Sequence, residues 1–116
     1  MTSFRIELPL PPSLNNAYGN RKNGGRYTKP HVYKWKVNAG WTASLAKLPK
    51  INGPYKLTIL LPQKMRGDVD NRAKLPSDLL VKLGVTPDDS KAVETTCRRD
   101  PNVPPGRCIV CAESAG

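Results

Sequence analysis

The sequence predicts a small α+β fold, a mixed β-sheet with about two main helices. Short segments that alternate hydrophobic and polar residues are typical of strands, and two longer segments repeat their apolar residues at helical spacing. With 116 residues the chain is long enough for one domain with a modest core, so we assign residues 1–116 to a single domain. Only 38% of the residues are hydrophobic and 12 are proline, which favours long loops around a small sheet.

The first strand is predicted at Phe4, Ile6 and Leu8, which alternate with less apolar neighbours. Prolines from Pro9 to Pro12 end it, because proline cannot donate to a sheet ladder. Residues 13–16 then predict a rigid corner, since serine and asparagine bond their own backbone in turns.

Residues 20–29 form a basic, glycine-rich segment around the turn dipeptide Asn23-Gly24. We expect either a basic finger that contacts DNA phosphates, with Tyr18 and Tyr27 at its base ready to stack on unpaired bases, or an ordinary solvated turn. The candidate DNA-binding residues here are Arg21, Lys22, Arg26 and Lys29.

A helix is predicted to begin at Pro30, which suits a first turn, with Thr28 as its cap. Its apolar face is Val32, Trp35, Ala39, Thr42, Ala43 and Ala46. Residues 49–54 are expected to be a loop, and a strand follows from Tyr55 to Leu61.

A second helix is indicated by the spacing of Leu75, Leu79 and Leu83, with Gly84 as its C-terminal cap. Pro76 disturbs this pattern, because proline in a helix interior removes a hydrogen bond. The helix therefore either begins near residue 71 and is kinked, or begins only just before Pro76.

Two further strands are predicted from Ala92 to Cys97 and from Arg107 to Ala112, joined by residues 98–106 as a hairpin loop. Cys108 and Cys111 alone are a poor zinc site, since a structural zinc needs four ligands.

Acidic residues gather between residues 66 and 89 of this basic chain: Asp68, Asp70, Asp78, Asp88 and Asp89 are five of its nine. Such crowding is self-repulsive unless a cation lies among the carboxylates, and Mg²⁺ prefers oxygen ligands. A helix followed by a short turn would return the last two aspartates to the first two, and Lys74 would lie close to all of them. A calcium loop is excluded, because its fifth and sixth positions would be Arg72 and Ala73. The alternative for Asp88-Asp89 is a simple turn after Pro87.

These residues resemble a known family. The pattern Asp-x-Asp-Asn-x-x-Lys from Asp68 to Lys74, the aspartate four residues later, the Leu-rich segment ending in Gly84 and the Asp88-Asp89 pair are similar to the RusA family of crossover junction endodeoxyribonucleases. The opening run of residues 8–18 is similar as well. One departure is Ser77 after Pro76, where the family leads us to expect apolar residues.

The resemblance implies a RusA-like, dimeric fold and a Holliday junction resolvase that acts in DNA recombination and repair by paired symmetric nicks. It places the catalytic residues at Asp68, Asp70, Lys74 and Asp89. The expected cofactor is one or two Mg²⁺ ions, with Mn²⁺ as a substitute, held by Asp68, Asp70 and Asp89, with Asp88 as a weaker candidate. Asn71 is expected to orient a ligating carboxylate, and Asp78 to pair with Lys74. We also assign Arg66 and Arg72 to DNA binding.

The formal charge of +10 favours a polyanionic partner, because Lys and Arg that neutralise phosphates release counterions. We expect four-way or other branched DNA as substrate and a homodimer as the active form. No segment approaches the roughly 20 apolar residues of a membrane span. Three cysteines, an odd number, fit a reducing compartment, so a cytoplasmic location is predicted, in a bacterium or a phage-infected host. The alternative function is a non-catalytic module that binds branched or single-stranded nucleic acid.

Overall fold

The computed structural model describes residues 2–13, 30–67, 69 and 72–115, and the backbone of residues 18–20 and 26–28. Along the chain the elements are β1 (Ser3–Pro9), β2 (Tyr18–Asn20), β3 (Arg26–Thr28), α1 (Pro30–Leu45), β4 (Tyr55–Pro62), α2 (Lys74–Lys82), the 3₁₀ turn η3 (Asp89–Lys91), β5 (Ala92–Asp100) and β6 (Arg107–Ser114). Both predicted helices and the predicted mixed sheet are present, so the α+β fold class is confirmed.

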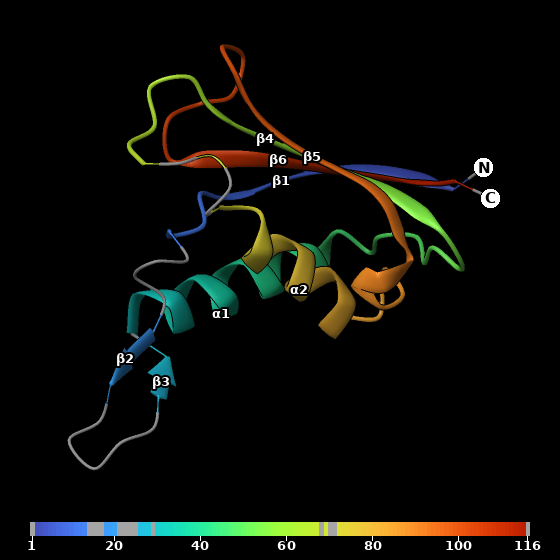
Figure 1. Ribbon diagram of the computed structural model, residues 1–116, viewed down its shortest axis with the longest axis horizontal. Coiled ribbons are helices and arrows are strands. Elements are labelled where there is room, and N and C mark those ends of the chain that lie inside the picture. Colours follow the sequence, from blue (N-terminus) through green and yellow to red (C-terminus); the bar gives the residue numbers. More distant parts are fainter. Residues whose placement is uncertain are drawn as a thin grey trace.

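The main sheet has four strands in the order β1-β6-β4-β5 (Figure 1). β6 pairs antiparallel with β1 on one side and with β4 on the other, whereas β5 runs parallel to β4. The parallel pair is possible because α2 lies in the crossover between β4 and β5. The prediction of a hairpin between the last two strands is therefore wrong, since β4 lies between β5 and β6.

The apolar sequence of β4 explains this order. Ile59, Leu60 and Leu61 are consecutive and all buried, so β4 is covered on both faces and needs a hydrogen-bonded neighbour at each edge. β5 and β6 supply these two neighbours, and residues 101–106 pass the end of β4. Within this loop Val103 packs against Leu60 and Ile109 on the sheet face away from the helices.

The two helices cover the other face of the sheet (Figure 1). α1 buries Val32, Trp35, Ala39 and Ala43, four of the six residues predicted for its apolar face. Thr42 is half-buried, and Ala46 is exposed because the helix ends at Leu45. Trp35 also fixes the end of β1, because its Nε1 donates to the carbonyl of Pro9 at 2.8 Å. Neither this helix nor any other in the described part of the chain has the length and apolar character to cross a membrane.

β2 and β3 form a separate antiparallel pair, with Tyr18 opposite Thr28 and Asn20 opposite Arg26. This pair projects beyond the N-terminal end of α1 (Figure 1). The strand pairing expected of a basic finger is thus present in the backbone. The Asn23-Gly24 turn lies outside the described residues, as do the side chain of Thr28 and its predicted capping bond.

α2 begins at Lys74, which settles the problem posed by Pro76. The proline is the third residue of the helix, where its missing N–H is not needed, and the N–H of Ser77 already bonds the carbonyl of Ala73 at 3.3 Å. The helix therefore begins just before Pro76. At its other end Gly84 has φ +75°, and bonds from Gly84 and Val85 back to the last turn form a Schellman motif, which confirms the predicted cap.

Candidate active site

Lys74 is the charged centre of the site. Its Nζ lies 3.1 Å from Oδ1 of Asp78, one turn along α2, and 3.2 Å from Oδ2 of Asp89, which follows the helix. All three side chains are about half exposed, so solvent and substrate can reach them. The predicted pairing of Asp78 with Lys74 is confirmed. The turn after the helix also returns Asp89 to this lysine, whereas the predicted approach of the aspartate pair to Asp68 and Asp70 involves residues outside those described.

The return of Asp89 depends on the end of α2. After the Gly84 cap the chain turns back toward the loop before β4, where the carbonyl of Val85 accepts from the N–H of Ile51 at 2.8 Å. Asp88 then caps η3, because its Oδ1 accepts from the N–H of Ser90 at 3.2 Å. The predicted turn is therefore real. One oxygen of Asp88 serves it, and the role of Asp88 as a metal ligand stays a prediction.

The charges in this group reinforce one another. Hydrogen bonds to Asp78 and Asp89 raise the pKa of Lys74 above its usual range. The pKa of Asp89 is lowered by hydrogen bonding to Asp88 and then by Lys74. At neutral pH Lys74 is therefore a cation and Asp89 an anion, which are the states that phosphate recognition and metal binding require.

A hollow of about 310 Å³ opens beside the pair of Lys74 and Asp89. Its lining includes two hydroxyl residues, Ser77 from α2 and Thr95 from β5, which the sequence did not single out. Ser77 had a detectable signal, since it lies three residues after Lys74 and so on the same helix face. Thr95 had none, because the parallel pairing that brings β5 beside α2 was not predicted.

The first part of the acidic motif lies outside the described residues, namely Asp68, Asp70 and Asn71. Val69 between them is described: it packs against the core, and its carbonyl accepts from Sγ of Cys97 on β5 at 3.4 Å. Val69 thus lies at the same strand, β5, that follows Asp89. In the part of the chain that the structure describes, no three His, Cys, Asp or Glu side chains form a metal cluster.

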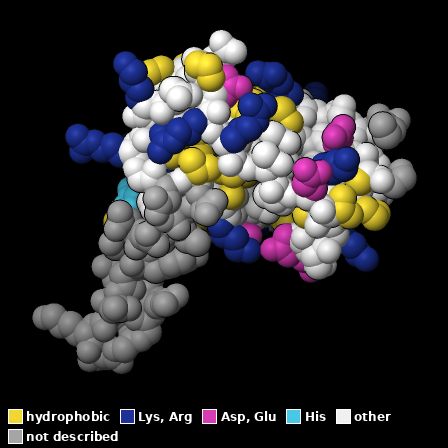
Figure 2. Space-filling model, turned by 45° about the horizontal axis from the view of Figure 1, so that its top comes forward, with side chains coloured by type: hydrophobic (Ala, Val, Ile, Leu, Met, Phe, Trp, Pro, Cys, Tyr) yellow, Lys and Arg dark blue, Asp and Glu magenta, His cyan; other side chains and the backbone are white. Residues whose placement is uncertain are grey.

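The residues assigned to DNA binding have different surroundings. The side chains of Arg21, Lys22, Arg26 and Lys29 are not among those described. Arg66 is exposed. Arg72 instead turns inward, because its Nη1 donates to the carbonyl of Pro11 at 2.6 Å and its Nη2 to that of Arg66 at 2.9 Å. Lys and Arg side chains are spread over the surface elsewhere (Figure 2).

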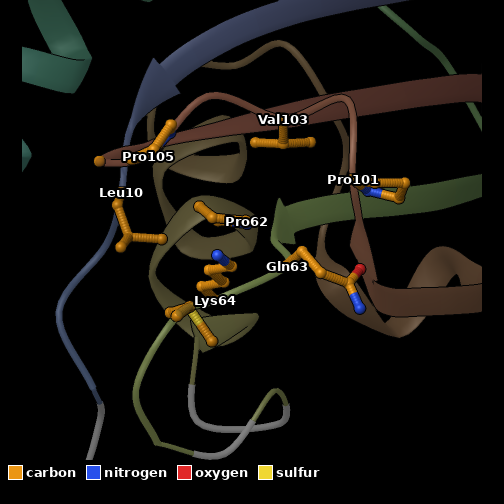
Figure 3. A pocket seen from close by; sticks show the side chains of 9 residues that line it. Leu10, Pro62, Gln63, Lys64, Pro101, Val103 and Pro105 are labelled. Atoms are coloured by element: carbon orange, nitrogen blue, oxygen red, sulfur yellow. The ribbon is translucent and has the colours of Figure 1, made fainter.

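A larger hollow, of about 400 Å³, lies at the end of β4 and is a poor candidate for catalysis (Figure 3). Its lining is mainly apolar and carries no carboxylate: Leu10, Pro62, Gln63, Lys64, Met65, Pro101, Val103, Pro105 and Gly106. Phosphodiester hydrolysis requires groups that bind a metal or stabilise charge, so the smaller hollow at Lys74 is the better candidate.

The chain is similar to known endodeoxyribonucleases over most of its length. The model of a family described as Endodeoxyribonuclease RusA matches residues 9–110. The crossover junction endodeoxyribonuclease RusA of Escherichia coli K12 is 30% identical over 110 residues, which cover 92% of this chain and 91% of the relative. The enzyme of that name from Enterobacteria phage 82 is 31% identical over 112 residues, with the same two shares. That of Aquifex aeolicus VF5 is 30% identical over 94 residues, or 78% of this chain and 73% of the relative.

Proposed function

Because the chain belongs to the RusA family of endodeoxyribonucleases, we propose that it resolves four-way DNA junctions by paired, symmetric, Mg²⁺-dependent nicks. Its relatives are named crossover junction endodeoxyribonucleases. The observation that carries the proposal is the contact between Lys74 and Asp89, which are 15 residues apart in the sequence. This contact lies at an open hollow lined in part by β5, the strand that also bonds the carbonyl of Val69. Its place of action would be the cytoplasm of a bacterium or of a phage-infected host.

The donor set fits magnesium. Asp89 is anionic and exposed at the hollow, and Asp68 and Asp70 flank Val69, whose carbonyl is held at β5. Asp68, Asp70 and Asp89 would hold the metal, and Asp88 would offer its second carboxylate oxygen. Carboxylate oxygens are the ligands that Mg²⁺ prefers, and Mn²⁺ accepts the same donors. When bound, the metal would supply charge stabilisation at the phosphate and lower the pKa of a bound water.

Lys74 would stabilise the charge that develops on the phosphate oxygens during cleavage. Its ammonium is fixed between two carboxylates before the substrate arrives, so little reorganisation is needed in the transition state. Asp78 would hold the lysine in place without touching the metal, and Asn71 would orient a ligating carboxylate. Arg66, together with the basic residues of the segment 20–29, would contact the DNA backbone; those residues are Arg21, Lys22, Arg26 and Lys29.

We also propose that the active form is a homodimer that associates through α1. Tyr33, Val37, Trp41 and Leu45 follow one another at intervals of four residues, and Tyr33, Trp41 and Leu45 are each about two-thirds exposed or more. This exposed row runs along one side of the helix, opposite the residues that α1 buries against the sheet. A two-fold pair of such rows would bury them against each other and present two identical active sites, as two symmetric nicks require.

The dimer is tested by Trp41→Glu, with Val93→Glu as the matched control because Val93 is an isolated exposed residue on β5. Sedimentation equilibrium should find the wild type and the control as dimers and Trp41→Glu as a folded monomer. A dimeric Trp41→Glu protein would exclude this surface.

The proposed activity is tested with a synthetic four-way junction labelled on each strand in turn. Wild type should make paired nicks with Mg²⁺ and none with chelator, and Asp70→Asn should bind the junction without cutting it. Tight binding without nicks by the wild type would refute the proposal and favour a non-catalytic junction-binding module.

A further inference from the structure

Side chains, and not a sheet or helix, hold the backbone that leads into the acidic motif. Residues 63–67 follow the end of β4 and belong to no regular element. Within the described residues, the backbone of this segment is held by a bond from the N–H of Met65 to the carbonyl of Pro62, at 3.4 Å. Gly67, immediately before Asp68, has φ +87°, which glycine adopts readily; because glycine can adopt many other conformations as well, this backbone needs support from its surroundings to stay in one of them.

Arg99 on β5 supplies most of that support. Its Nη1 donates to the carbonyls of Gln63 at 3.1 Å and Met65 at 2.6 Å, and its Nη2 donates to the carbonyl of Gly67 at 2.9 Å. One guanidinium thus binds three carbonyls on alternate residues of the segment. Lysine could not reproduce this fork, because its ammonium is a single point from which donors diverge.

Arg72 holds the same segment from the other end of the motif. Its Nη2 bonds the carbonyl of Arg66, and its Nη1 ties the segment to Pro11 after β1. Burial and the nearby charge of Arg99 lower the pKa of Arg72. Two cations are therefore placed close together, and the row of carbonyl oxygens between them offsets their repulsion.

We propose that Arg99, together with Arg72, positions the acidic motif for metal binding, an inference that rests on the proposed nuclease function. The two arginines fix the carbonyls on one side of Asp68, and Arg72 lies two residues after Asp70. The described chain on either side of the two aspartates is then fixed relative to β5, the strand that follows Asp89. Arg99 is a positioning residue in this account, because its guanidinium bonds three backbone carbonyls of the segment.

The test compares Arg99→Met with Arg98→Met. Arg98 is the exposed neighbour on the same strand, so each variant loses one positive charge and one trypsin site. Limited trypsin digestion in chelator, followed by mass spectrometry, reports cutting after Lys64 and Arg66 inside the held segment. We expect Arg99→Met to be cut there at least fivefold faster than the wild type and Arg98→Met to be cut at the wild-type rate.

A second readout follows from metal binding. The Mg²⁺ concentration for half-maximal junction cleavage should rise about tenfold or more in Arg99→Met, as for other groups that orient metal ligands. Junction binding in chelator should be unchanged. Arg99→Lys should show a smaller rise, and it replaces Arg99→Met if that variant does not fold.

The outcomes separate this inference from the proposed function. If Arg99→Met or Arg99→Lys matches the wild type in both the digestion and the Mg²⁺ dependence, the positioning role is refuted while the nuclease function stands. Weaker junction binding in chelator with an unchanged digestion rate would likewise overturn it, because Arg99 would then be a DNA contact. If the wild type cuts no junction, the proposed function fails, and the digestion still reports whether Arg99 holds the segment.

Discussion

Replacing Lys74 with methionine should abolish most of the activity and leave the fold nearly unchanged. Methionine keeps the unbranched stem and removes the ammonium that lies 3.1 Å from Asp78 and 3.2 Å from Asp89. The side chains of the Lys74–Asp78 pair are 50% and 48% exposed, so solvent screens it. Pairs of this kind, four residues apart on a helix, contribute about 0.3–0.5 kcal/mol, which corresponds to a shift of about 2 °C in Tm.

The expected effect on catalysis is much larger. Removing one preorganised group that stabilises transition-state charge lowers kcat by about 10²–10³, or roughly 2.7–4 kcal/mol. The assay is single-turnover cleavage of a labelled four-way junction at saturating Mg²⁺, with Tm measured on the same preparation. Asp78→Asn is the control, because it removes one partner of Lys74 and leaves the contact with Asp89; we expect its rate to stay within about tenfold of the wild type. A Lys74→Met enzyme that cleaves at the wild-type rate would refute the catalytic role of Lys74.

Three further predictions concern stability. The neighbours of Asp89 lower its pKa below the ordinary 3.8. Its contact with Lys74 should therefore stabilise the folded state above pH 3.8, and this stabilisation should be lost as the pH falls through the lowered pKa. In denaturant titrations, the free energies of unfolding of the wild type and of Lys74→Met should become equal in acid. Gly84→Ala should lower the free energy of unfolding by about 1–2 kcal/mol through its positive φ alone. Gly40→Ala is the control: its new Cβ would meet Leu79 at an ordinary 3.8 Å, so it should be neutral or stabilising. Thermal melting measures both. Trp35→Phe removes the bond to Pro9 and also leaves space in the core, so it should lose about 1 kcal/mol or more, which unfolding in urea can measure. An unchanged midpoint would show that neither the bond nor the packing of the indole contributes to stability.

The sequence predicted those parts of the fold that depend on local patterns. The positions of α1, of β4 and of the Gly84 cap follow from apolar spacing and glycine chemistry, which act within a few residues. The positions of β5 and β6, which pair with opposite edges of β4, depend instead on which strand is buried on both faces. The alternating pattern alone suggested that β5 and β6 form a hairpin. In the structure β4, with its consecutive apolar residues, lies between them.

The candidate site was predictable to a similar extent. Lys74 and Asp78 are one turn apart on a helix, so their contact follows from spacing, and the return of Asp89 follows from a short helix with a capped end. The inward turn of Arg72 was not predictable, since a basic residue beside an acidic motif in a DNA enzyme suggests a phosphate contact. Its bonds to Pro11 and Arg66 depend on where β1 ends relative to the motif, which only the folded chain defines.

The most direct test of the central claim is whether Asp89 belongs to the same metal site as the acidic motif. Calorimetric titration with Mn²⁺ should compare the wild type with Asp70→Asn, Asp89→Asn and Glu94→Gln, the last being an exposed carboxylate that faces Lys56. We expect both aspartate variants to lose at least tenfold in affinity and Glu94→Gln to bind as the wild type does. An Asp89→Asn protein that binds Mn²⁺ with wild-type affinity would contradict the account.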